Sequence, residues 1–141
     1  ALARLAVEET GYGVVADKVQ KNLFVSRQVY EFIRPMRTVG DINRIEDRKI
    51  VEIGEPFGVV AAVVPSTNPT STAIYNVLIA LKARCAIVVS PHPSAARCII
   101  REVEIMAEAA ARAVSAPPKM VAKAKPTPEA PATGPTMFVS I

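Results

Sequence analysis

The chain has 141 residues, 50% of them hydrophobic, so it fits one ordinary domain, or part of a larger protein, with enough apolar residues for a core. Its formal net charge of +4 comes from scattered lysines and arginines, tryptophan is absent, and aromatic residues make up 5%. This composition argues against a nucleic-acid partner, and polar residues interrupt the longest apolar stretch, 74–89, which argues against a membrane span.

The first part of the chain is predicted to be helical. Residues 1–10 resemble the end of a helix, which the glycines that follow stop. Residues 14–33 carry apolar side chains at helical spacing and should form an amphipathic helix that ends before Pro35. The apolar positions are Val15, Val19, Leu23, Val29, Phe32 and Ile33. Asp17 and Lys21 are expected to form an i, i+4 pair on the polar face.

A strand is predicted over residues 49–53, where polar and apolar residues alternate, after the segment 37–48, which has no clear period. Two similar units follow the turn at 54–58. Each unit has an apolar strand, a short polar loop and a helix: strand 59–64, loop 65–70 and helix 71–83, then strand 85–90, loop 91–93 and helix 94–114.

The strands of these two units are apolar throughout, which predicts that both of their faces are buried. Because the strands alternate with helices, we expect parallel strands joined by right-handed crossovers. The fold class is therefore α/β, the opening of a doubly wound sheet.

The composition changes after Ser115. The stretch PPKMVAKAKPTPEAPATGP is rich in proline, alanine, lysine and threonine and has no hydrophobic period, so it should bury too little to offset its ordering entropy. We divide the chain into a folded part, 1–114, and a low-complexity tail, 115–141. The third strand expected for the sheet is missing, although the residues from Met137 onward could form a strand edge.

The cysteines indicate neither a metal site nor a disulfide framework. Cys85 and Cys98 are the only cysteines and His92 the only histidine, and they form no CxxC motif or Cys/His cluster. We expect two buried, reduced thiols, as is typical of a cytoplasmic protein.

The polar loops after the two strands are the candidate functional region. In open α/β sheets, ligands bind beyond the carboxyl ends of the strands. No glycine-rich phosphate-binding motif is present in the chain. Asn68, between Pro65 and Pro69, has two interpretations: its amide could stabilise an oxyanion, or it could belong to a turn before a helix capped by Thr70 or Ser71. Spacing alone favours the turn.

His92, between two prolines, could act as a general base, contact a ligand or lie at the surface. No acidic or nucleophilic residue stands close to it in the sequence, which favours a surface loop.

Longer motifs resemble the aldehyde dehydrogenase superfamily. They are EPFGVVAAVVPSTNPTSTAIYNVLIALKARCAIVVSPHPSAA, the upstream VEETGYGVVADKVQKN and the TVGDI segment. The combination of VPSTNPTSTAI and SPHP is similar to the coenzyme-A-acylating branch, which includes the N-terminal half of bifunctional aldehyde–alcohol dehydrogenases. The resemblance covers about residues 1–114.

The resemblance implies an NAD(P)-binding domain, a catalytic domain and an oligomerisation extension in a homo-oligomer. It implies oxidation of a short-chain aldehyde through a cysteine thiohemiacetal and acyl transfer to coenzyme A. Asn68 then stands where the family has the donor to the thiohemiacetal oxygen. Pro65, Ser66 and Thr67 are expected near the nicotinamide, and the segment Ser90-Pro91-His92 near the adenosine ribose. Ser90 replaces the lysine of common aldehyde dehydrogenases, so neither NAD nor NADP is preferred.

The chain departs from this family in two respects. The family's nucleophilic cysteine lies far downstream, and neither Cys85 nor Cys98 occupies its place. After Ala113 the tail differs from the family's loop and third strand, which suggests a fragment whose tail is disordered or out of register. We therefore expect no activity from the chain alone. The alternatives are a non-catalytic nucleotide-binding module and a non-functional, truncated remnant.

Overall fold

The computed structural model describes residues 1–113 and the backbone of 137–139. The elements are α1 (Leu2–Thr10), α2 (Val15–Leu23), a π-helical segment (Phe24–Val29), α3 (Tyr30–Ile33), β1 (Gly40–Ile45), β2 (Ile50–Gly54), β3 (Val59–Val64), α4 (Pro69–Lys82), β4 (Ala86–Pro91), α5 (Ala96–Ala113) and β5 (Met137–Val139). Short 3-10 turns lie at Glu46–Arg48 and Pro93–Ala95. The predicted α/β class is confirmed. Most of the tail predicted over 115–141 lies outside the described residues, so its order stays a prediction.

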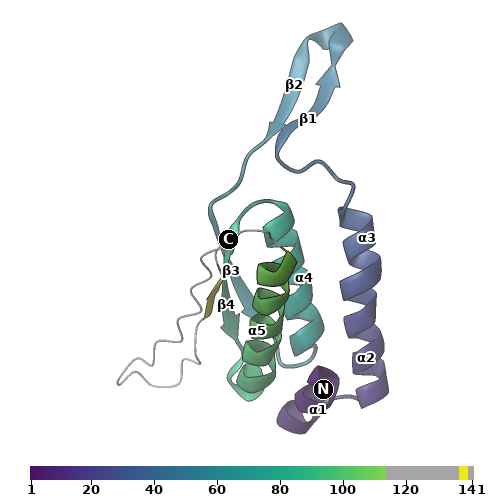
Figure 1. The fold of residues 1–141 in the computed structure, drawn as a ribbon, viewed down its shortest axis with the longest axis vertical. Helices are drawn as coiled ribbons and strands as arrows, with labels where there is room; N and C mark the ends of the chain where they lie inside the picture. Colours follow the sequence, from purple (N-terminus) through teal and green to yellow (C-terminus); the bar gives the residue numbers. More distant parts are fainter. Residues whose placement is uncertain (114–136, 140–141) are drawn as a thin grey trace, which may run out of the picture.

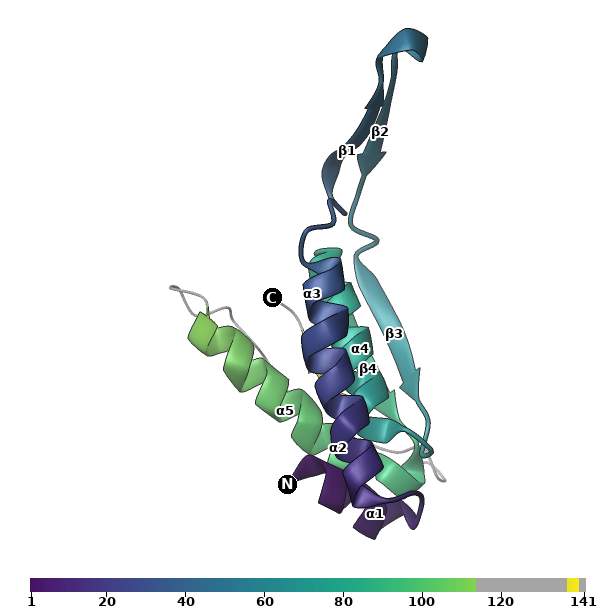
Figure 2. The same cartoon turned by 90° about the vertical axis from the view of Figure 1, so that its right-hand side faces the viewer.

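The elements form layers (Figures 1 and 2). The sheet of β3, β4 and β5 carries α4 and α5 side by side on one face, and the rod formed by α2 and α3 packs on α4 from the far side. The core lies between the sheet and these helices. Its largest fully buried apolar side chains are Val64, Val77, Ile87, Val89, Ile99 and Val103. None of the described helices is long and apolar enough to cross a membrane.

The sheet confirms the predicted parallel pairing. β3 pairs with β4 in parallel, with Val59 opposite Ala86 and Val64 opposite Pro91. β5 adds a third strand beside β4, and it runs antiparallel. The strand edge considered possible from Met137 onward is therefore present as β5. The parallel third strand of a crossover unit is not among the described residues.

The prediction that both faces of the strands are buried was wrong for β3. Ala62 and Val64 are buried, whereas Val59 and Val63 are 65% and 80% exposed. The physical reason is that α4 and α5 cover one face only, and no element of the described chain covers the other (Figure 1). In β4, Ile87 and Val89 are buried and their neighbours are half-buried.

The helix predicted over residues 14–33 is present but not uniform. Its middle turn, Phe24–Val29, is π-helical, which places one extra residue in the turn. The apolar stripe of the sequence breaks at the same place, between Leu23 and Val29. The side facing α4 includes Lys18, which is 5% exposed, whereas Val19 of the predicted stripe is 41% exposed.

A carboxylate of the first helix, α1, caps the N-terminus of α5. Glu9, near the end of α1, accepts hydrogen bonds from the backbone N–H groups of Arg97 and Cys98, at 2.8 and 2.7 Å. These N–H groups lie in the first turn of α5, where no intrahelical acceptor is available. A carboxylate at a helix N-terminus also interacts favourably with the helix dipole. Glu9 therefore holds α1 against the start of α5.

A two-stranded arm projects from the layers (Figure 2). Its second strand, β2, confirms the predicted strand, but β1 lies in the segment for which no structure was predicted. At the base of the arm, a Cβ on Gly54 would lie 2.5 Å from the carbonyl oxygen of Thr38, so only glycine fits. The Thr38 hydroxyl in turn donates to the carbonyl of Lys82 at 2.6 Å, which ties the arm to α4.

Candidate functional site

The two predicted loops meet at the carboxyl edge of the sheet. Because β3 and β4 are parallel, with Val63 opposite Ser90 and Val64 opposite Pro91, the two strands end level and the segments that start at Pro65 and His92 leave the same edge. The backbone N–H of His92 donates to the carbonyl of Val64 at 2.9 Å, which fixes this neighbourhood. The structure therefore brings all the predicted site residues to one edge, where α/β sheets bind ligands.

Asn68 occupies the N-cap position of α4, and the helix begins at Pro69. Its side chain makes no capping hydrogen bond to the helix. The prediction that Thr70 or Ser71 caps the helix was wrong, because both lie inside its first turn. Proline suits the first helical position, since it has no N–H group there to be satisfied. The Thr70 side chain is buried and donates to Oδ1 of Asn22 at 2.9 Å.

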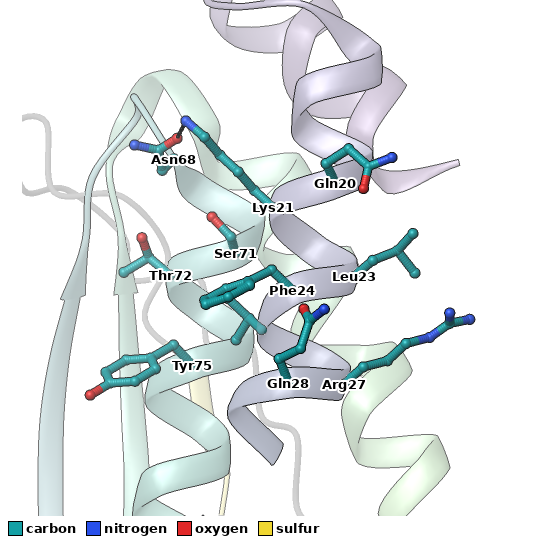
Figure 3. A pocket seen from close by; sticks show the side chains of 11 residues that line it. Gln20, Lys21, Leu23, Phe24, Arg27, Gln28, Asn68, Ser71, Thr72 and Tyr75 are labelled. Atoms are coloured by element: carbon teal, nitrogen blue, oxygen red, sulfur yellow. Dashed lines mark hydrogen bonds between the residues drawn. The ribbon is translucent and has the colours of Figure 1, made fainter. Parts of the chain in front are cut away.

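The side chain of Asn68 is held by Lys21. The Lys21 Nζ donates to Asn68 Oδ1 at 2.9 Å, from α2 across to the start of α4 (Figure 3). An ammonium group can only donate, so it fixes which end of the amide faces it. The amide nitrogen therefore points away from Lys21, as Figure 3 shows. The predicted pairing of Lys21 with Asp17 is not among the ion pairs of the described residues.

A second lysine of α2 holds the loop backbone. Lys18 is 5% exposed, and its Nζ donates to the carbonyl oxygen of Thr67. Burial lowers the pKa of Lys18, and the nearby positive charge of Lys21 lowers it further. The sequence analysis missed both lysines as site residues: it placed Lys21 on the polar face, where a charged residue ordinarily faces solvent, and assigned no role to Lys18.

A pocket of about 730 Å³ opens beside Asn68, between the α2 rod and α4. Figure 3 shows its lining side chains, which come from these two helical elements. They are Gln20, Lys21, Leu23, Phe24, Val25, Arg27, Gln28, Asn68, Ser71, Thr72 and Tyr75. The π-helical segment supplies several of these residues, as is frequent at functional sites. The pocket mixes apolar and polar groups and contains no carboxylate.

His92 lies at the surface of the second loop. Its Nδ1 accepts a hydrogen bond from the backbone N–H of Ser94 at 3.1 Å, which starts the 3-10 turn before α5. Pro91 is buried, Ser90 is half-buried and His92 is exposed. The hydrogen bond with Ser94 gives His92 a structural task, in agreement with the surface-loop interpretation.

Both cysteines are buried, as predicted, and neither is in a disulfide. Burial raises the pKa of the Cys98 thiol to about 12, with further contributions from a hydrogen bond to Glu9 and from its charge. The Cys85 Sγ accepts from the backbone N–H of Phe57 at 3.2 Å. In the described part of the chain, no group of His, Cys, Asp and Glu side chains could hold a metal ion.

A model of the aldehyde dehydrogenase family matches residues 1–127. The chain belongs to the aldehyde dehydrogenase family. The first relative is aldehyde-alcohol dehydrogenase 2 of Entamoeba histolytica, 51% identical over 110 residues, which are 78% of this chain and 13% of that protein. The aldehyde-alcohol dehydrogenase of Clostridium acetobutylicum is 47% identical over 79% of this chain, which corresponds to 13% of the Clostridium protein.

Solved structures agree with this assignment. The acetylating aldehyde dehydrogenase from Geobacillus thermoglucosidasius is 56% identical and superposes with a TM-score of 0.79, over 84% of this chain and 26% of that one. The resemblance to the acylating branch is thus confirmed, and aldehyde dehydrogenases of this family use NAD or NADP. The chain spans about an eighth of the curated relatives' length. The roles of individual site residues stay predictions.

Proposed function

We propose that the full-length protein oxidises a short-chain aldehyde to an acyl-coenzyme A, with NAD or NADP as the hydride acceptor. Asn68 is the oxyanion donor of this reaction. The observation that carries the proposal is the orientation of the Asn68 amide, which Lys21 fixes beside a pocket between α2 and α4. A donor that is held in place before the reaction stabilises developing negative charge without reorganisation.

The neighbouring loops fit a dinucleotide. Pro65, Ser66 and Thr67 follow the end of β3 at the edge where Ser90 and Pro91 end β4 and His92 follows it. Apart from Pro91, these residues are exposed or half-buried, so their polar groups are accessible to a ligand. We assign the first segment to the nicotinamide end and the second to the adenosine ribose. Bound there, the cofactor supplies hydride acceptance, and the loops hold and orient it.

The chain alone is expected to have no aldehyde dehydrogenase activity. Thiolates are the reactive form of cysteine, and a thiol pKa of about 12 leaves almost no thiolate on Cys98 at neutral pH. Cys85 is 5% exposed, its Sγ accepts a hydrogen bond from the backbone N–H of Phe57, and it stands just before β4, not at the family's nucleophile position. These are the only cysteines of the chain. The nucleophile must therefore come from the rest of the full-length protein.

A chimera tests the proposed function. In it, residues 1–113 of this chain replace the matching part of the Geobacillus enzyme, which keeps that enzyme's remaining residues. We expect the chimera to form NADH or NADPH and acyl-coenzyme A when given an aldehyde and coenzyme A, and the purified 141-residue chain to form neither. A folded chimera that forms no reduced cofactor, or an active isolated chain, would contradict the proposal.

We also propose that the β1–β2 arm joins copies of the full-length protein into a homo-oligomer. The arm projects away from the other described elements and carries exposed apolar side chains (Figure 1). They are Ile42, Ile50, Val51 and Ile53, which are 42–63% exposed. A two-stranded ribbon is marginally stable by itself and gains stability when such a face is covered.

The arm proposal predicts a change of mass. Replacing the outward-facing isoleucine Ile53 by lysine in the chimera is expected to shift the oligomer toward monomer, as measured by light scattering, because a charge would be buried in the contact. The equivalent change at Tyr12, an exposed residue outside the arm, is the control and should leave the mass unchanged. An unchanged mass in the Ile53→Lys variant would reject the arm as the contact.

A further inference from the structure

We propose that Lys21 is a positioning residue for the reaction: its ammonium group sets the orientation of the Asn68 amide and strengthens that amide as a donor. The inference rests on the proposed role of Asn68. It also assigns a role to the end of the upstream motif VEETGYGVVADKVQKN, which the proposed function leaves unexplained.

The first step of the argument is geometric. Three side chains of α2 lie at spacing i, i+3 and i+4 and hold three consecutive parts of the site loop. Lys18 donates to the Thr67 carbonyl, Lys21 to Oδ1 of Asn68, and Asn22 accepts from the Thr70 hydroxyl. This spacing places side chains on one helix face. The loop around Asn68 is therefore held by contacts 47–49 residues away in sequence.

The second step concerns the amide itself. A carboxamide has an acceptor end and a donor end, and a half-turn about its last bond exchanges them. A neutral partner such as water or a hydroxyl would accept either end. Lysine offers donors only, so it accepts just one of the two orientations, with the Asn68 N–H group directed away from it (Figure 3).

The third step is electrostatic. A positive charge 2.9 Å from the amide oxygen draws electron density toward that oxygen. The N–H group at the other end becomes a stronger donor, because hydrogen bonds in series polarise one another. The effect needs no contact between Lys21 and the substrate. Lys21 therefore acts through Asn68, which separates it from a residue that attracts a charged substrate directly.

A double-mutant cycle in the chimera tests this. Lys21→Met keeps the length of the side chain and removes its charge, and we expect kcat to fall about tenfold with the KM for aldehyde nearly unchanged. Lys21→Arg, also a pure donor, should retain most of the rate. In the Asn68→Ala background, Lys21→Met should lower kcat no further. Lys82→Met is the matched control: this lysine also donates across helices, to the Arg34 carbonyl at 2.7 Å, and its loss should leave kcat unchanged.

The outcomes separate the two proposals. If Asn68→Ala leaves kcat unchanged, the role of Asn68 is wrong and the inference fails with it. Two other outcomes would contradict only the positioning role, provided that Asn68→Ala slows the reaction. One is that Lys21→Met alone leaves kcat unchanged. The other is that Lys21→Met lowers kcat as much in the Asn68→Ala variant as in the unaltered chimera. A joint rise of KM for cofactor and aldehyde in Lys21→Met would indicate a merely structural role.

A second measurement needs no catalytic turnover and uses the 141-residue chain. The side-chain amide signals of Asn68 in a nitrogen–proton correlation spectrum are identified by their loss in Asn68→Ala. We expect these signals to move in Lys21→Met and to stay in place in Lys82→Met. Unchanged signals in Lys21→Met would overturn the proposed polarisation of the amide.

Discussion

Asn68→Ala in the chimera is expected to slow aldehyde oxidation by two to three orders of magnitude, about 3–4 kcal/mol of transition-state stabilisation. The variant removes the amide NH2 group that Lys21 directs away from itself. It leaves α4 intact, because the Asn68 side chain makes no capping bond to that helix. The measurement is kcat for NADH formation at saturating aldehyde, coenzyme A and cofactor.

The appropriate control for Asn68→Ala is a neighbouring polar residue of the same pocket. Ser71→Ala removes a hydroxyl that lines the pocket one helical turn further on, without touching the amide. We expect Ser71→Ala to change kcat less than about threefold, since the proposed reaction places no developing negative charge at the Ser71 hydroxyl. Equal losses in the two variants would show that the pocket surface, and not the Asn68 amide, carries the effect.

Glu102→Met is expected to raise the free energy of unfolding at pH 8 by about 2–3 kcal/mol. Glu102 lies on α5 with 3% of its surface exposed, and its Oε2 has no hydrogen-bond partner among the described residues. Burial raises the pKa of this carboxyl to about 7 from an ordinary 4.5. Methionine fills the same space without a charge.

The pH dependence of this effect has a definite sign. Between pH 4.5 and 7 the folded state keeps the Glu102 proton while the unfolded state releases it, so the free energy of unfolding falls as the pH rises through this window. Above pH 7 the fall, about 3 kcal/mol, is complete. Glu102→Met should remove this pH dependence of the free energy of unfolding, and at pH 4.5 it should raise that free energy only slightly. Urea unfolding of the 141-residue chain at both ends of the window measures it.

Glu108→Met on the same helix is the control for Glu102. The Glu108 side chain is 56% exposed and lies 3.8–3.9 Å from two arginines, so its loss should change the free energy of unfolding by less than about 1 kcal/mol at either pH. A stabilisation by Glu102→Met that is equal at pH 4.5 and pH 8 would contradict the raised pKa of Glu102.

Much of the fold follows from the sequence because it depends on local patterns. The apolar runs at 59–64 and 85–90 each precede a helical period, which is sufficient to predict parallel strands and the edge where their loops meet. The break in the stripe between Leu23 and Val29 was also visible, and it marks the π-helical turn. β1 was missed because it has no apolar alternation of its own and exists through its pairing with β2.

The exposed face of β3 was mispredicted for a different reason. An apolar run indicates that a strand suits burial on both sides, but whether a layer lies on each side depends on the rest of the protein. Here α4 and α5 cover one face, and Val63 is 80% exposed on the other.

In the candidate site, too, some features follow from the sequence and others depend on the tertiary structure. The sequence by itself determined that Asn68 follows a buried strand, that its neighbours are proline and small polar residues, and which family motif they form. Only the tertiary structure decided how the amide is oriented, because Lys21 and Asn68 are 47 residues apart and meet only when α2 packs on α4. Helical periodicity assigned Lys21 to the polar face and gave Lys18 no role, since it describes one helix and contains no information about the loop that precedes another.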